Sequence, residues 1–138
     1  MVSLIIGRRG TGKTKRLIDL VNASLETSNG NVICVEKETK LTYDINYRAR
    51  LIAADSFEID GYEALFGFIS GICAGDHDIT DLFIDATLRI GGRNFDELSA
   101  FLKKIKRLSD MTDTKIIITL SADLEELPSE IFDYCEKI

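Results

Sequence analysis

Residues 7–14 read GRRGTGKT and match the pattern G-x-x-x-x-G-K-[ST] at every fixed position. Residues 2–6 before this stretch (VSLII) suit a short strand buried on both faces, and residues 13–26 after it carry apolar side chains at helical spacing. A glycine-rich turn between a strand and a helix can curl so that several backbone N–H groups and the helix N-terminus face one anion. The stretch therefore predicts a phosphate-binding loop.

The side chains of this loop are expected to grip a nucleotide and its metal ion. Lys13 is placed to reach the β- and γ-phosphates, and the Thr14 hydroxyl to ligate Mg²⁺. Cations are concentrated in residues 8–16, and no acidic residue precedes Asp19, which favours an anionic ligand. The residues expected to contact the nucleotide are Gly7, Arg8, Arg9, Gly10, Thr11, Gly12, Lys13, Thr14 and Lys15.

Strand and helix patterns alternate along the rest of the chain. Apolar runs predict strands at residues 31–35, 50–54, 79–85 and 114–120. Helical spacing predicts helices at residues 62–73 and 94–108, the second capped by Asn94. Gly67 and Gly71 in the first helix are expected to pack closely on the sheet. The alternation predicts an α/β fold, a three-layer sandwich with a predominantly parallel five-stranded sheet and helices on both faces.

The composition suits one domain over residues 1–138, with 45% hydrophobic and 29% charged residues. The longest apolar run, residues 64–74, is shorter than the roughly 20 residues that cross a bilayer, and the first residues lack the basic region of a secretory signal. We therefore expect a cytoplasmic protein without a membrane span. The formal net charge of −6 does not favour nucleic acid as a partner.

The cysteines and the histidine point away from metal and disulfide chemistry. Cys34, Cys73 and Cys135 form no CxxC pair and are expected to be buried apolar residues. His77 is the only histidine, which disfavours a histidine metal site or a Ser-His-Asp triad.

A second candidate position ends the apolar run LFID at residues 82–85. Ligands of open α/β sheets bind at the carboxyl ends of the strands, where Asp85 is expected. Asp85 is therefore predicted to share Mg²⁺ with Thr14, as a Walker B aspartate does. Asp81 is expected in the turn that leads into this strand.

These residues give the chain a resemblance to the P-loop NTPases. GRRGTGKT corresponds to the Walker A motif and LFID to the Walker B motif, and the order of elements resembles the RecA-like core of the additional-strand branch, here as a minimal single-domain member. The resemblance implies ATP and Mg²⁺ as ligands. It also implies the sheet order 3-2-4-5-1, with the strand at residues 115–120 between the Walker A and Walker B strands.

The resemblance implies candidates for catalysis. Many members of the branch carry the water-activating glutamate directly after the Walker B aspartate, where this chain has Ala86. RecA-like recombinases, clock ATPases and hexameric helicases carry it at the end of the second strand, where Glu36 and Glu38 stand. Either glutamate, together with Lys13, is therefore expected to be catalytic.

Further residues match positions that contact the terminal phosphate in these families. Thr119 and Ser121 match the polar position that senses the γ-phosphate. Arg89 and Arg93 are candidates for an arginine finger, which usually acts across a subunit boundary.

Three functions remain open. The first is a small Mg²⁺-dependent ATPase or ATP-driven switch, with ATP taken as the default nucleotide. The second is a nucleoside or small-molecule kinase resembling thymidine kinase, with the loop at residues 39–50 receiving the acceptor. The third is an ATP-binding regulatory module that does not hydrolyse. If residues 2–6 form the edge of the sheet, we expect self-association, a protein partner or a C-terminal segment to cover it.

Overall fold

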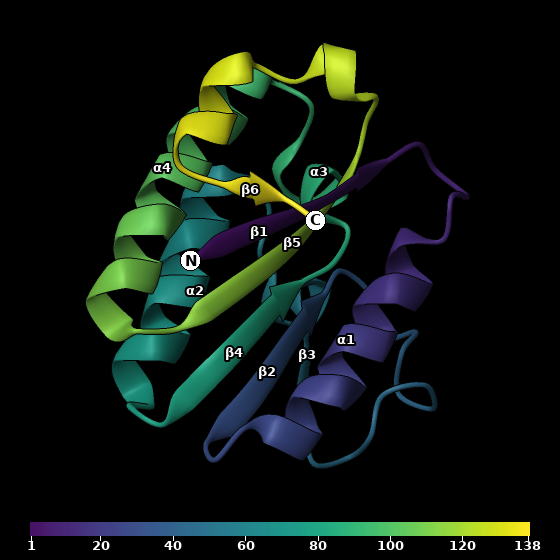
Figure 1. Cartoon of the computed structure of the whole chain (residues 1–138), viewed down its shortest axis with the longest axis vertical. Coiled ribbons are helices and arrows are strands. Elements are labelled where there is room, and N and C mark those ends of the chain that lie inside the picture. The colour runs from purple at the N-terminus through teal and green to yellow at the C-terminus, as the bar shows by residue number, and fades with distance from the viewer.

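The computed structural model describes residues 1–138, in which a six-stranded sheet carries helices on both faces (Figure 1). All neighbouring strands pair in parallel, in the order β3-β2-β4-β5-β1-β6. The α/β class and the order 3-2-4-5-1 are confirmed, and a sixth strand is added beside β1. The strands are β1 (Val2–Gly7), β2 (Asn31–Glu36), β3 (Arg50–Ala53), β4 (Ile79–Ile84), β5 (Lys115–Ser121) and β6 (Glu136–Lys137).

Different helices cover the two faces of the sheet. On one face lies α1 (Lys13–Thr27), where Leu17 and Val21 are fully buried against Phe83 of β4. The larger core lies on the other face and includes Leu65 and Leu102. Figure 1 shows α1 on one side of the sheet and α2 and α4 on the other. The helices of the second face are α2 (Tyr62–Gly75), α3 (Thr87–Gly91) and α4 (Phe95–Thr112), and 3-10 turns form η1 (Ala54–Phe57), η2 (Leu124–Glu126) and η3 (Ser129–Asp133).

The short strand β6 covers the edge of the sheet that β1 was expected to form. Ser3 and Leu4 of β1 pair in register with Glu136 and Lys137, and the Ile138 N–H donates to the Leu4 carbonyl oxygen at 2.9 Å. An exposed edge strand offers unpaired backbone groups to other chains. The C-terminal segment, one of the coverings expected from the sequence, is therefore present at this edge.

The expectation that Gly67 and Gly71 pack closely against the sheet is wrong. A Cβ atom added at either glycine would have no atom within 4 Å, and both residues are exposed. The buried positions of α2 include Leu65 and Ile69. Two residues of helix turn the side chain by about 200°, so Gly67 and Gly71 point away from the sheet. No helix combines the length and the apolar composition needed to cross a bilayer.

Asp81 lies inside β4 and not in the turn before it, which corrects the sequence-based expectation. Its register partners are Val32 of β2 and Lys115 of β5. The side chain is 9% exposed and accepts a hydrogen bond from the Ser24 hydroxyl of α1 at 3.5 Å. The hydroxyl donor gives this mostly buried carboxylate a hydrogen-bond partner at a strand position.

Two local predictions are confirmed. The Asn94 side chain accepts hydrogen bonds from the backbone N–H groups of Asp96 and Glu97, at 3.1 and 3.0 Å, and so caps α4. The three cysteines are buried free thiols. Burial raises the pKa of the Cys135 thiol to about 12, so this thiol is protonated at neutral pH.

Candidate functional site

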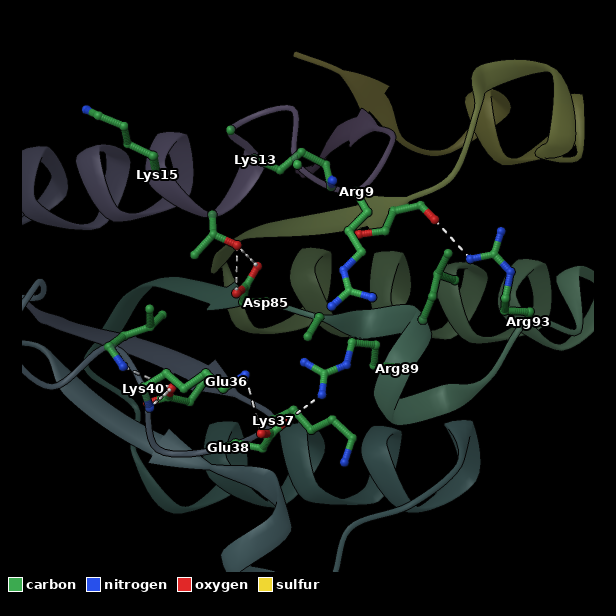
Figure 2. Close-up of a pocket in the computed structure, with 17 residues that line it drawn as sticks. Arg9, Lys13, Lys15, Glu36, Lys37, Glu38, Lys40, Asp85, Arg89 and Arg93 are labelled. Atoms are coloured by element: carbon green, nitrogen blue, oxygen red, sulfur yellow. Dashed lines mark hydrogen bonds and ion pairs between the residues drawn. The ribbon is translucent and has the colours of Figure 1, made fainter.

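A cleft of about 590 Å³ opens at the carboxyl ends of the strands. Four segments that are distant in the sequence line it: the glycine-rich turn with the start of α1, the end of β2 with the loop after it, the segment after β4, and the end of β5. Figure 2 shows Lys13 above and Glu36 and Glu38 below, with Asp85 between them in this view. Parallel strands bring these segments together because all of them end at the same edge of the sheet.

The glycine-rich turn has a backbone conformation that favours glycine at two positions. Gly10 and Gly12 have φ angles of 83° and 86°, in the left-handed region that disfavours side chains with a Cβ atom. A Cβ atom at Gly7 would lie 2.6 Å from the Thr11 hydroxyl oxygen. That hydroxyl donates to the Arg8 carbonyl oxygen at 2.6 Å, which closes the turn. The predicted loop between β1 and α1 is therefore present, at the start of a helix.

Lys13 is the buried cation of the turn. Its ammonium group donates to the Arg8 carbonyl oxygen at 2.8 Å, and the residue is 9% exposed. Burial lowers the pKa of the Lys13 ammonium, and the nearby Asp85 carboxylate acts in the opposite direction. An ammonium group has three N–H donors, and only one of them is used here. The other two can donate to an anionic ligand.

Asp85 and Thr14 meet across the cleft. The Thr14 hydroxyl lies 3.2 and 3.4 Å from the two carboxylate oxygens of Asp85. Asp85 is fixed from the other side, since the Thr119 hydroxyl donates to its Oδ1 at 2.7 Å and accepts the Ala86 N–H at 3.1 Å. Thr119 is 2% exposed, and its hydroxyl is occupied by these two hydrogen bonds. Ser121, in contrast, lines the cleft.

These oxygens suit a hard divalent cation that a ligand helps to hold. No group of three or more His, Cys, Asp or Glu residues forms a metal site in the chain. Mg²⁺ usually binds proteins through one or two side chains and takes its remaining oxygens from phosphates and water. Asp85 and Thr14 fit that pattern.

The two candidate glutamates have different surroundings. Glu36 ends β2 and is 3% exposed; its Oε1 accepts the backbone N–H groups of Lys40 and Leu41 at 2.8 and 3.2 Å. Its other oxygen, Oε2, is buried without a hydrogen-bond partner. Glu38 forms ion pairs with Arg89 and Lys40. The hydrogen bond from Arg89 lowers the pKa of Glu38.

The two candidate arginines after Asp85 are held by partners. Arg89 is paired with Glu38. Arg93 donates to the Ser121 carbonyl oxygen at 2.9 Å and lies 3.4 Å from Glu126. Both arginines line the cleft, so the structure brings them to the predicted site. Each is already paired with a glutamate there.

Two basic residues of the cleft were missed in the sequence. Lys37 and Lys40 line it from the loop after β2, and Lys37 pairs with Asp55 at 2.9 Å. Their closeness to Glu36 and Glu38 in the sequence was the available signal. Conversely, the Arg8 side chain, predicted in the site, pairs with Asp123 at 2.5 Å and does not line the cleft.

Fold and site together describe a parallel α/β protein with the strand order that the resemblance implied and with a glycine-rich turn at the carboxyl edge of the sheet. No family model and no curated protein matches the chain. Among solved structures, it is similar to the flagellar accessory protein FlaH from Methanocaldococcus jannaschii, with a TM-score of 0.60 and 20% identity over 96% of this chain. The match spans 65% of FlaH. At this identity the likeness concerns the fold alone.

Proposed function

We propose that the chain binds a nucleoside triphosphate together with Mg²⁺ and hydrolyses it, with ATP as the expected nucleotide. One observation carries the proposal: a loop that matches G-x-x-x-x-G-K-[ST] ends in Thr14, whose hydroxyl lies against the Asp85 carboxylate within one cleft. The likeness to FlaH supports a nucleotide-binding fold of the RecA-like kind. Hydrolysis of the nucleotide is proposed from the residues of the cleft.

Each part of the cleft has a role in this proposal. The amide groups of the turn and the Lys13 ammonium hold the phosphates, and Lys13 exchanges its contact with the Arg8 carbonyl for phosphate oxygens. Thr14 and Asp85 are the residues that hold Mg²⁺. When bound, the ion neutralises negative charge on the phosphates and orients them.

The surroundings of the glutamates favour Glu36 as the group that orients water. A base needs a free lone pair and a pKa that lets it accept a proton. Glu36 keeps one oxygen without a partner, while both oxygens of Glu38 are in ion pairs and its pKa is lowered. We therefore assign the role to Glu36 and treat Glu38 as a partner of Arg89.

The function is tested by incubating the purified chain with ATP and Mg²⁺ and measuring phosphate release without an added acceptor. We expect release that stops when EDTA removes the ion. The Lys13→Ala variant, purified in parallel, measures any contaminating ATPase. ADP formation only with an added nucleoside would indicate the kinase, and tight ATP binding without turnover the regulatory module. Absence of any nucleotide binding would refute the proposal.

Replacing Thr119 tests how Asp85 is oriented. Thr119→Val removes the hydroxyl that donates to Asp85 and accepts from the Ala86 N–H. Loss of a hydrogen bond that orients a metal ligand usually costs 10–100-fold in metal affinity. We expect the Mg²⁺ concentration that gives half-maximal ATP binding to rise by about 10-fold, and Thr119→Ser to restore most of it. Equal behaviour of the valine and serine variants would contradict this role.

A further inference from the structure

Arg9 differs from every other cation that lines the cleft. It forms no ion pair and donates no side-chain hydrogen bond, although it lies in the same wall as Lys13. Each of the others has a partner within the chain. The pairs are Lys13 with the Arg8 carbonyl, Lys15 with Asp19, Lys37 with Asp55, Lys40 and Arg89 with Glu38, and Arg93 with Glu126.

The two neighbouring arginines of the turn point to different parts of the molecule. Arg8 turns to the C-terminal segment and pairs with Asp123 at 2.5 Å. Arg9 extends from the turn into the cleft, toward the region where Arg89 reaches in from the opposite side (Figure 2). A guanidinium group presents several donors in a planar fork that fits phosphate oxygens, so an unpaired one beside a phosphate-binding turn is suited to an anion.

We propose that Arg9 contacts the terminal phosphate of a bound nucleoside triphosphate, so that the loop itself supplies the arginine that distinguishes a triphosphate from a diphosphate. This inference rests on the function proposed above. Arg89 and Arg93 would have to leave Glu38 and Glu126 to reach the same phosphate, and Arg9 has no contact to break. A second copy of the chain is then not needed to complete the positive charge around the terminal phosphate.

The test compares ATP and ADP affinities in the full chain with Mg²⁺, by calorimetry. We expect Arg9→Ala to weaken ATP binding by about 10–150-fold, the range of a lost hydrogen bond to a charged group, and ADP binding by less than about 3-fold. Arg9→Lys should fall between the alanine variant and the unchanged chain, since it keeps the charge and loses the fork. Arg107→Ala, which removes an exposed arginine from α4, should change neither affinity.

The possible results separate this inference from the proposed function. Equal losses for ATP and ADP, or no loss, in Arg9→Ala would overturn the role of Arg9 and leave nucleotide binding intact. Failure of the unchanged chain to bind ATP would overturn both. A hydrolysis rate per molecule that rises with protein concentration would show that the active form needs a second copy, which contradicts the inference that one chain completes the charge around the terminal phosphate. Thermal unfolding of Arg9→Ala should match the unchanged chain, because no contact of the side chain is lost.

Discussion

Lys13→Ala is expected to abolish binding of the nucleoside triphosphate while the chain stays folded. The Lys13 ammonium is the buried cation of the turn, and its only partner is the Arg8 carbonyl oxygen. Removing a cation that makes charge-assisted bonds to phosphates in a partly buried site should weaken ATP binding by at least about 100-fold, or about 2.7 kcal/mol. Calorimetric titration with ATP and Mg²⁺ measures the loss.

The control for this variant must separate lost binding from lost structure. Because the one hydrogen bond of Lys13 stays within the turn, the thermal unfolding midpoint is expected to move by no more than about 3 °C. Lys103→Ala removes an exposed lysine from α4 and should leave ATP affinity unchanged. An affinity of Lys13→Ala equal to that of the unchanged chain would remove the basis for the phosphate-binding assignment.

The second large effect is expected for Glu36→Gln. Glutamine keeps an oxygen for the N–H groups of Lys40 and Leu41 and replaces the partnerless Oε2 with an amide nitrogen, which cannot accept a proton. If Glu36 orients and deprotonates water, the hydrolysis rate should fall by about 10²–10⁴-fold with ATP affinity changed by less than about 3-fold. Single-turnover phosphate release, with ATP bound to all sites, measures the rate without a contribution from binding.

Glu38→Gln is the matched comparison, since it makes the same change two residues away. It removes the negative charge that pairs with Arg89 and Lys40, and it should lower the hydrolysis rate by less than about 10-fold. A large loss in Glu38→Gln with normal turnover in Glu36→Gln would reverse the assignment. Normal turnover in both variants would mean that neither glutamate is the base.

Glu36 connects the candidate site to the loop after β2. Glu36 accepts the backbone N–H groups of Lys40 and Leu41, while the side chain of Lys40 pairs with Glu38. The orientation of Glu36 therefore depends on the conformation of this loop, and both belong to one wall of the cleft. The buried carboxylate is held by backbone donors, which fix its position more firmly than a mobile side chain would.

The sequence by itself determined the features that contiguous residues encode. GRRGTGKT between an apolar run and a helical pattern specified the turn between β1 and α1, and the alternation of patterns specified the parallel sheet. Asp85 was assigned correctly to the end of its strand because parallel strands in an α/β sheet end at one edge. Such features depend on spacing and on local backbone chemistry, which a single sequence contains.

Only the tertiary structure decided how the side chains are paired. The sequence could not show that the Thr119 hydroxyl donates a hydrogen bond to Asp85 or that Glu38 forms an ion pair with Arg89. It also could not show that the Arg9 side chain has no ion-pair or hydrogen-bond partner. Nor could it show that β6 covers β1, since a two-residue strand has no detectable period. These outcomes depend on competition among groups that the fold brings together from distant positions, so they are settled by three-dimensional proximity and not by spacing along the chain.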